Sequence, residues 1–558
     1  MIICSTDKGI YLKWREEKES KHKHISFNTF KPYFYIKASD KDILPKSTYI
    51  RDIHGSLNVN LNYEESSKIS LDKKPLVKIT WSPSRPEYAR KINKILLGKN
   101  IETYEADVSF HYRYAVDKIT EIKSSALRKW YWDMEWQQNG EHNGAITCIS
   151  FHDTFLKETK LFYWLPEGVN SDLSKKYPNR FSSEKEMLEN YLSFLLLCNP
   201  DMLISWFGWK FDLPKLLERL VHNKIDARLL SPVSQVTGIS WRKNAPSINV
   251  KRTESYSPIS QPIKGRICFS LDLAFERQWN DSQKGTLPSM ALDYISETVL
   301  GDKKLVSGKF PDKNEFFKRA WLEDTETYFD YAIKDTDLLV RIDNENYTTE
   351  SVLALQRLLK APLDACFYAS NMGGIYFMRN ANWIVKTGNK NSERKNYDGA
   401  MVYNPLSENT NGLHIGVAAF DYKSLYPSMM VARNISWETK SDVPTEFKIN
   451  IKTPKDFTDI VEEEIVYFKT DKLGLLPKAV LELQNLRNSY KQKMKVSSNK
   501  EEYNKWNSNQ MAVKRLMASF YGVLAYQGFS WADVDLAASI TASAREAIRE
   551  AAFIVREL

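Results

Sequence analysis

Two acidic residues in an aromatic run could hold a metal ion. Asp133 and Glu135 lie two apart in the run 130–136, and residues two apart on a strand point to the same face of a sheet. Two neighbouring carboxylates repel each other unless a cation lies between them, so we expect a bound metal ion. The alternative is an edge strand with solvated acids, but the flanking tryptophans favour burial.

Three further residues extend this set. Asp212 follows an apolar run and a glycine-containing turn, where an aspartate alone is typical of a helix N-cap. Tyr331 and Asp335 are four apart in a helix predicted over 326–341, so they share one face. Four carboxylates and a phenol could hold two Mg²⁺ ions, with Mn²⁺ as an alternative, and orient water for phosphodiester hydrolysis.

A second candidate metal ligand is Asp421, which follows the apolar run 416–420. That run predicts a buried strand. Pro427 keeps Tyr426 out of the helical region and can begin a helix. A strand-end aspartate before such a turn could hold Mg²⁺ under a triphosphate.

Basic residues follow on two predicted helices, from about 475 and from 509 to 521. Arg487 and Lys491 share one face of the first helix, and Lys514 lies on the second. If the helices are antiparallel with these cations facing inward, they would bind a triphosphate. A solvated basic face is the alternative.

Bulk composition indicates a multidomain chain. Its 558 residues are too many for one domain, and 42% hydrophobic residues allow large cores. The net charge of +9 weakly favours an anionic partner such as nucleic acid. Five cysteines without C-x-x-C spacing predict neither a zinc site nor disulfides. We expect a cytoplasmic protein without signal peptide or membrane span, because 199–201 interrupt the most apolar run, 191–207.

The remaining pattern predicts the supporting elements. Strands are expected at 9–14, 32–36 and 265–273, and helices at 85–97 and from 212 through 220. We expect Lys21–His24 to be a solvated basic loop and Asp272 to be structural.

Several of these stretches resemble motifs of the family B DNA polymerases. Asp421–Met430 resembles motif A, and Lys514–Gly522 resembles motif B, with Ala518 where the family has Asn. Tyr397–Ala400 resembles the family's Y-x-G-G/A element. The acidic set resembles the motifs of DnaQ-like proofreading exonucleases, with Phe207 in place of an Asn. That substitution puts a contact to the substrate strand in doubt.

The resemblance implies a role for each matching residue. The catalytic residues would be Asp421 and Tyr331, and Tyr426 would exclude a 2′-OH. The metal ligands would be Asp133, Glu135, Asp212, Asp335, Asp421 and the backbone carbonyl of Tyr422. The incoming nucleotide would contact Ser424, Leu425, Tyr426, Arg487, Lys491, Lys514 and Tyr521. The DNA would contact Tyr397, Gly399 and Gly522.

The implied fold is multidomain α+β: a small N-terminal domain, an RNase H-like (DnaQ-like) 3′–5′ exonuclease domain, and an incomplete palm with helical fingers. The expected boundaries are 1–110 for the N-terminal domain, joined by part of 341–385, and 111–340 for the exonuclease. The palm would take 386–470 and 523–558, and the fingers 471–522.

One family motif is missing. Motif C, an Asp-Thr-Asp hairpin, does not follow motif B; Asp335–Asp337 has that sequence but lies in the exonuclease helix. We therefore expect a split DNA-directed DNA polymerase, completed by a second subunit with motif C and the thumb. Primer–template DNA and dNTPs would be its substrates, and a sliding clamp is a candidate partner. The alternatives are a 3′–5′ exonuclease or DNA-binding subunit with an inactive polymerase remnant, and a non-enzymatic scaffold.

Overall fold

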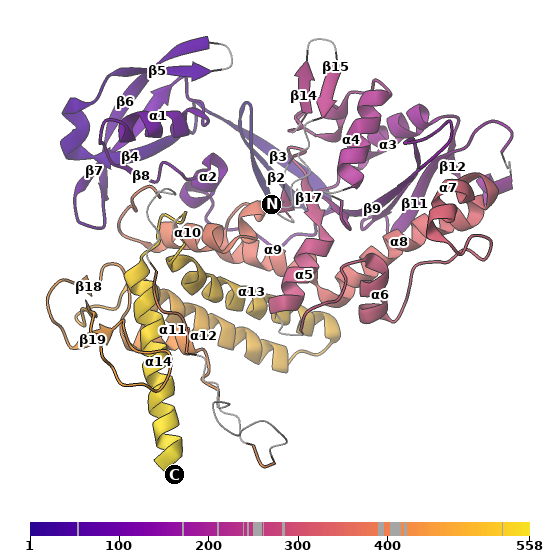
Figure 1. Ribbon diagram of the computed structural model, residues 1–558. Helices are drawn as coiled ribbons and strands as arrows, with labels where there is room; N and C mark the ends of the chain where they lie inside the picture. Colours follow the sequence, from indigo (N-terminus) through magenta and orange to yellow (C-terminus); the bar gives the residue numbers. More distant parts are fainter. Residues whose placement is uncertain are drawn as a thin grey trace. The chain divides into compact units, whose positions relative to one another are not determined.

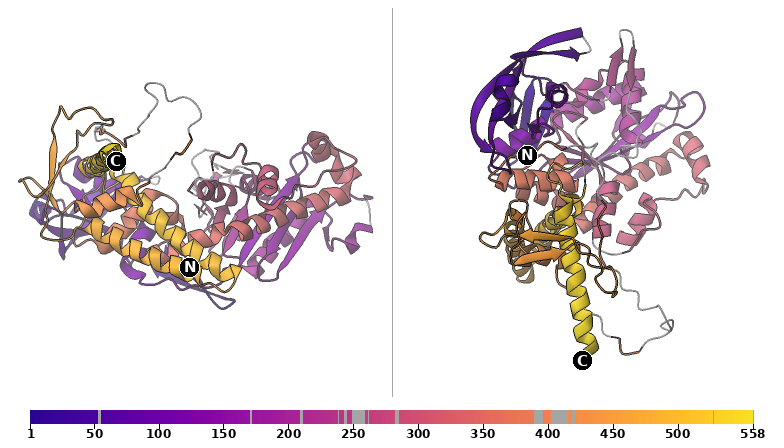
Figure 2. Two further views of the ribbon diagram at one scale, coloured as in Figure 1. Left: turned by 90° about the horizontal axis from the view of Figure 1, so that it is seen from below. Right: turned by 60° about the vertical axis from the view of Figure 1, so that its left-hand side comes forward.

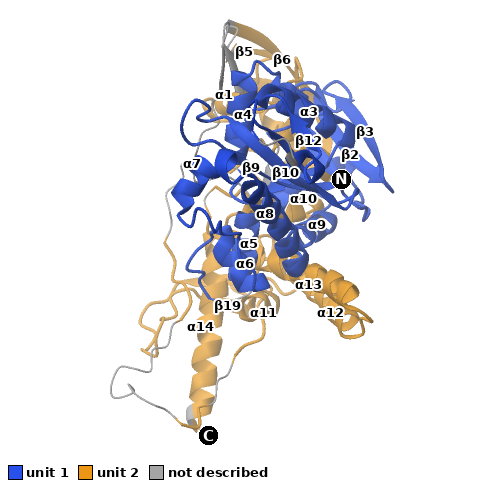
Figure 3. Cartoon of the chain, turned by 90° about the vertical axis from the view of Figure 1, so that its right-hand side faces the viewer, with its two compact units in different colours: residues 1–30, 117–367 blue, residues 31–116, 368–558 orange. Residues whose placement is uncertain are grey.

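The chain forms two compact units, shown in Figure 3: Met1–Phe30 with Asp117–Phe367, and Lys31–Val116 with Tyr368–Leu558. The computed structural model describes residues 1–52, 55–169, 172–208, 211–237, 239–242, 245–248, 259–260, 262–281, 285–388, 396–401, 415–417, 421–526 and 528–557. Both units combine helices and sheets, so the predicted α+β class is confirmed.

A seven-stranded mixed sheet forms the centre of the first unit (Figure 1). β9, β13 and β17 are parallel, while β10 runs antiparallel to β9 and β11. The strands, in spatial order, are β12 (Asn179–Phe181), β11 (Glu158–Trp164), β10 (Ile146–Asp153), β9 (Lys129–Trp136), β13 (Met202–Ser205), β17 (Ile267–Ser270) and β16 (Ile259–Ser260). A separate hairpin joins β14 (Ile239–Arg242) and β15 (Ala245–Ile248).

Strand β9 presents its alternate side chains to two different helices. Trp130 stacks on Phe194 of α3 (Glu184–Cys198), with ring centroids 5.8 Å apart. The next residue, Tyr131, donates from its hydroxyl to Asp343 of α8 (Thr325–Asn346) at 2.5 Å. Because side chains alternate along a strand, Asp133 points to the same face as Tyr131, toward α8. Glu135, two residues further, shares that face.

The other helices of this unit connect or flank these elements. The interruption of the apolar run 191–207 is a turn between a helix and a strand: Asn199 ends α3 in the left-handed conformation, and β13 follows. The predicted strand 265–273 is wrong at its end, because β17 stops at Ser270 and the next residues begin a helix. Besides α3 and α8, the helices described in the first unit are α4 (Asp212–His222), α5 (Leu271–Asp281), α6 (Leu292–Leu300), α7 (Lys313–Glu323) and α9 (Thr348–Leu359).

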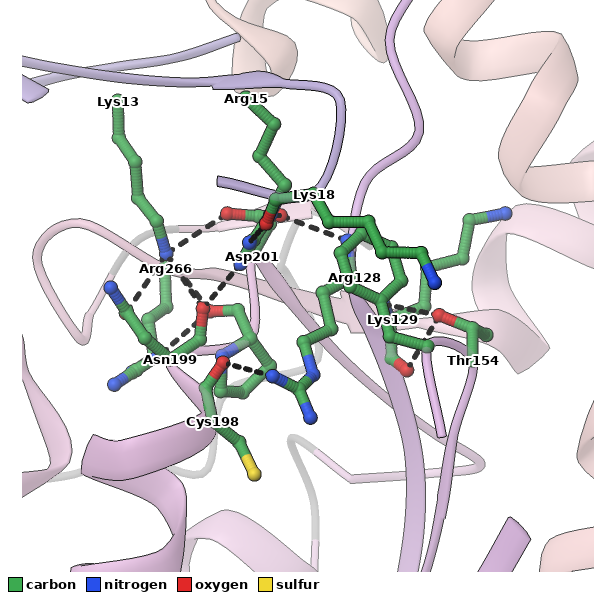
Figure 4. A network of polar contacts seen from close by, with 12 residues as sticks. Lys13, Arg15, Lys18, Arg128, Lys129, Thr154, Cys198, Asn199, Asp201 and Arg266 are labelled. Atoms are coloured by element: carbon green, nitrogen blue, oxygen red, sulfur yellow. Dashed lines mark hydrogen bonds and ion pairs between the residues drawn. The ribbon is translucent and has the colours of Figure 1, made fainter. Parts of the chain in front are cut away.

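A buried ion network fixes the N-terminal strands to this unit (Figure 4). β1 (Ile2–Thr6), β2 (Gly9–Glu16) and β3 (Glu19–Ser26) form a small antiparallel sheet. Lys13 and Arg15 from β2 both pair with Asp201, and the Lys13 Nζ to Asp201 Oδ1 distance is 2.9 Å. Arg266 donates to the Pro200 carbonyl at 2.6 Å. Residues 1–30 thus group with the large sheet and not with the rest of the expected domain 1–110.

The predicted loop at Lys21–His24 is wrong, since these residues lie within β3. His22 and His24 remain exposed, so the expectation of solvation holds although the element is a strand. Pairing with β2 satisfies the backbone hydrogen bonds of these residues. A charge pattern alone does not reveal such pairing.

The second unit consists of a five-stranded antiparallel sheet, a helical region and a small antiparallel sheet of β18 (Lys440–Ser441), β20 (Ile465–Phe468) and β19 (Phe447–Asn450). α1 (Tyr88–Leu97) covers the five-stranded sheet through Ile92 and Leu96, both fully buried. Ile384 and Lys386 bridge to Ser70 and Tyr104, so the end of 341–385 does pack on this sheet. Its strands, in spatial order, are β5 (Ser47–Asp52), β6 (Gly55–Ile69), β7 (Pro75–Ser82), β4 (Tyr33–Lys37) and β8 (Thr103–Tyr104); α2 (Phe110–Lys118) follows.

Helices dominate the C-terminal part of the second unit. α12 (Leu475–Lys495) and α13 (Lys500–Leu524) lie side by side, as Figure 1 and the left view of Figure 2 show. α13 begins earlier than the predicted 509, because Asn499 caps it by accepting from the Glu502 backbone N–H. The other elements are α10 (Ala369–Asn380), α11 (Leu425–Ala432), the strands β18, β19 and β20, and α14 (Val534–Glu557). Within the described ranges, no helix is long and apolar enough to cross a membrane.

Candidate functional site

Three of the predicted carboxylates meet beside α8. Oxygen atoms of Asp133, Glu135 and Asp335 lie within 4.8 Å of one another. The first two come from one face of β9, and Asp335 comes from the helix that covers that face. Strand pairing places the acids, since Asp133 and Glu135 lie opposite Ser150 and Cys148 of the adjacent β10.

The electrostatics of this acidic cluster call for a cation. Burial and the neighbouring Asp335 raise the pKa of Asp133 to about 7. Burial, Asp133 and Asp335 hold the pKa of Glu135 well above its usual range. Asp335 is 1% exposed, and its Oδ1 has no hydrogen-bond partner among the described residues. Buried carboxylate oxygens that lack a hydrogen-bond donor suit divalent metal ions, which prefer such ligands.

Asp212 lies close to the acidic cluster but outside the group of three. It is 4% exposed, and burial together with the charge of Asp133 raises its pKa well above the usual range. α4 starts with Asp212 itself, and Phe211 occupies the N-cap position. The N-cap alternative for Asp212 is therefore wrong.

Lys304 completes the acidic cluster and was missed from the sequence. Its ammonium donates to the Tyr331 hydroxyl at 3.0 Å and bonds Asp335 at a shorter distance. Burial alone would lower the pKa of Lys304, but Asp335, Tyr331 and Asp133 raise it well above the usual value. Lys304 belongs to none of the motifs or spacings identified in the sequence, so the sequence offered little signal.

Phe207 stands where the resemblance predicts Asn. Its backbone is left-handed, with φ of +55°, a conformation that Asn adopts far more readily than an aromatic residue. Its ring centroid lies 6.5 Å from that of Phe211, which is 53% exposed. Nearby Asp272 is buried and accepts from Ser270, in keeping with the structural role predicted for it.

The second predicted metal ligand, Asp421, is exposed and lies four residues before the first residue of α11. Ser424 turns the chain with φ of +59°, and α11 begins at the next residue. Tyr426 therefore lies within the helix, and the expectation that Pro427 keeps it out of the helical region is wrong. The ring of Tyr426 packs on that of Tyr521 with centroids 4.4 Å apart. The strand predicted over 416–420 cannot be assessed, because 418–420 lie outside the described residues.

The predicted cations of α12 and α13 act on one another electrostatically. The charge of Arg487, followed by burial, Lys423 and Lys514, lowers the pKa of Lys491. Arg487 is oriented by Gln510 of α13, whose side-chain oxygen accepts from Nε at 3.1 Å. A bound anion would reduce this repulsion between the positive charges. Lys423 is one of these charges and was missed, because it lies in motif A and not on either helix.

The predicted DNA-contacting element is fixed by α14. Arg545, fully buried, donates to the carbonyls of Asp398 and Gly399 at 2.8 and 2.6 Å. The Tyr397 hydroxyl lies 3.4 Å from that of Tyr521. A Cβ built at Gly399 or Gly522 would have no described atom within 4 Å, so both glycines border open space.

Comparison with known proteins matches most of the chain to DNA polymerases. Residues 375–558 match the model of DNA polymerase family B, and residues 134–268 match the model of its exonuclease domain. A DNA polymerase of Pyrococcus glycovorans is 26% identical over 475 residues, which cover 82% of this chain and 55% of the relative. One of Thermococcus sp. (strain 9oN-7) is 25% identical and covers 97% of this chain and 66% of the relative.

The fold has a close counterpart among solved structures. The structure of the family B DNA polymerase from Pyrobaculum calidifontis superposes with a TM-score of 0.68 at 17% identity, over 100% of this chain and 71% of that chain. This chain spans less than two thirds of the length of the two curated relatives. The two family models together match more than half of its residues. The chain therefore belongs to DNA polymerase family B, with an exonuclease region followed by a polymerase region.

Proposed function

We propose that this chain removes nucleotides from DNA 3′ ends and takes part in template-directed DNA synthesis. The observation that carries the proposal is the acidic cluster of Asp133, Glu135 and Asp335, with Tyr331 and Lys304 beside it. Its elevated carboxylate pKa values mark a site built for cations and not a solvated acidic surface.

The acidic cluster is suited to phosphodiester hydrolysis. Two Mg²⁺ or Mn²⁺ ions, when bound, would activate water and neutralise phosphate charge. Asp133, Glu135 and Asp335 would hold them, with Asp212 as the fourth carboxylate. The Tyr331 hydroxyl is directed by Lys304 and could orient the attacking water.

Degradation of 5′-labelled single-stranded DNA by the purified chain tests the nuclease proposal. We expect shortening from the 3′ end that requires Mg²⁺ or Mn²⁺. Asp133→Ala should abolish it, whereas Asp337→Ala, which removes an exposed acid from the same helix as Asp335, should not. Full activity in Asp133→Ala would remove this residue from the site.

The cations on the fingers helices support nucleotide binding. Arg487, Lys491 and Lys514 would contact the triphosphate of a dNTP, with Ser424 and Leu425 at the start of α11 beneath it. Tyr426, packed on Tyr521, would lie against the sugar. Primer–template DNA would pass the open space at Gly399 and Gly522.

A second polypeptide would complete the synthetic site. A two-metal phosphoryl transfer needs more than Asp421 and the Tyr422 carbonyl. Among the described residues, the only grouping of three or more acidic, His or Cys metal ligands is the acidic cluster of the first unit. A subunit with a further palm carboxylate and a thumb would supply what is needed, and a sliding clamp could add processivity.

Primer extension distinguishes the two proposed roles. We expect the chain alone to extend a primer poorly with Mg²⁺ and dNTPs, and to do so efficiently once the second subunit is added. Robust extension by the single chain would contradict the split arrangement. The exposed Ala518, unable to hydrogen-bond, favours the alternative of a nuclease with an inactive polymerase remnant; failure of extension with every candidate subunit would support it.

A further inference from the structure

A short segment between α6 and α7 delivers Lys304 to the acidic cluster. α6 ends at Leu300, and Gly301 caps it in the left-handed conformation with φ of +65°. The backbone N–H of Lys304 then donates to Asp293 Oδ1 at 3.0 Å. From this anchored backbone the side chain reaches the Tyr331 hydroxyl and Asp335.

Asp302 ties the same segment to α8. Its Oδ2 accepts from Lys334 Nζ at 2.6 Å and also pairs with Arg341. Its Oδ1 accepts from the Lys303 backbone N–H at 2.8 Å. Lys334 immediately precedes Asp335, so the carboxylate of Asp302 and the ammonium of Lys304 bind neighbouring positions of one helix. Two contacts of this kind fix the position of the segment along the helix axis.

These ion pairs are partly exposed, with side chains of Asp302, Lys334 and Arg341 that are 31%, 23% and 39% exposed. Exposed pairs contribute little to global stability, so their main consequence is local. A lysine side chain is long and loses much rotamer freedom when it is fixed. The backbone is anchored on both sides of Lys303, at Asp302 and at Lys304. Fewer conformations are therefore open to the Lys304 side chain, and fixing its ammonium costs less conformational entropy.

We propose that Asp302 is a positioning residue for the nuclease site: it clasps the 301–304 segment to α8 and so holds Lys304 against Tyr331 and Asp335. The functional part of this inference rests on the proposed exonuclease activity, whereas the positioning part does not. Asp302 contacts none of the acidic cluster itself, and it acts through Lys304.

Amine labelling tests the positioning directly and needs neither metal nor activity. In the full chain treated with an acetylating reagent, peptide mass spectrometry should find Lys304 protected and the exposed Lys303 modified. Asp302→Asn should label several-fold faster at Lys304, with little change at Lys303. Asp337→Asn is the matched control, because Asp337 pairs with Arg341 at 3.4 Å but does not contact the segment. Equal labelling of Lys304 in wild type and Asp302→Asn would overturn the proposal.

Kinetics then test the consequence for hydrolysis. Asp302→Asn should lower kcat on single-stranded DNA by about 10- to 100-fold, the range typical of residues that orient active-site ligands. KM should stay nearly constant, and Asp302→Glu should restore part of the rate. In a Lys304→Met background, Asp302→Asn should have no further effect, because both changes remove the same contact. If the fold-losses in kcat caused by Asp302→Asn and Lys304→Met instead multiplied in the double variant, Asp302 would act by another route, and the proposal would be overturned.

The labelling and kinetic results fail in distinguishable ways. A wild-type chain without nuclease activity would contradict the proposed function, but it would leave the labelling comparison fully informative. Active wild-type protein with unchanged Lys304 protection in Asp302→Asn would overturn only the clasp. A change in the melting temperature of Asp302→Asn, followed in parallel, would reveal any global unfolding.

Discussion

Divalent ions should bind the acidic cluster in competition with protons. Burial and Asp335 raise the pKa of Asp133 to about 7 in the metal-free chain. A raised pKa means that the carboxyl is protonated below about pH 7, and a metal ligand must be deprotonated. Metal affinity should therefore fall as the pH falls through 7, in a range where ordinary aspartates are fully ionised.

The magnitude follows from that pKa. A carboxyl with a pKa of about 7 is roughly 90% ionised at pH 8 and roughly 10% ionised at pH 6, so this ligand alone weakens binding about tenfold, or about 1.4 kcal/mol. The pKa of Glu135 is also held well above its usual range, and its protonation acts in the same direction. Tenfold is accordingly a lower limit.

Mn²⁺ titration of the DNA-free chain, followed by electron paramagnetic resonance, measures this dependence. We expect at least about a tenfold rise in Kd between pH 8 and pH 6. Calorimetry at pH 7 in two buffers with different ionisation heats should also detect proton release on binding. Asp133→Asn, which cannot ionise, should bind weakly at both pH values. A wild-type Kd that stays constant from pH 8 to pH 6 would refute the reasoning.

Three further perturbations test other parts of the chain. Asp201→Asn leaves Lys13 and Arg15 buried without a carboxylate and should lower the unfolding free energy by about 3–5 kcal/mol in denaturant titrations. In contrast, Glu323→Gln, at an exposed pair of the same unit, should change it by less than about 1 kcal/mol. Arg545→Met should weaken primer–template binding in fluorescence anisotropy, because two carbonyls of the Tyr397–Ala400 element lose their donor; unchanged affinity would argue against α14 as its support. Tyr426→Ala should raise ribonucleotide incorporation by the reconstituted enzyme, and unchanged discrimination between dNTPs and NTPs would remove the steric role.

The spacing of residues within single elements predicted the strand and the helix that carry the acidic cluster. Alternation in β9, together with its tryptophans, indicated that Asp133 and Glu135 share a buried face, and the four-residue spacing in α8 indicated the same for Tyr331 and Asp335. These predictions hold because each depends on the period of a single element. The charge run at Lys21–His24, by contrast, correctly indicated solvation but not the strand that carries it.

The sequence by itself determined the family motifs, the α+β class and the three carboxylates of the acidic cluster. Only the tertiary structure decided what surrounds them: Lys304 against Asp335, the Asp302 clasp, and the division of residues 1–30 from the rest of the N-terminal domain. The physical reason is the same in each case. Side chains that are distant in sequence meet because separate elements pack together, and a charged residue is read as solvated until the carboxylate that it pairs with is found.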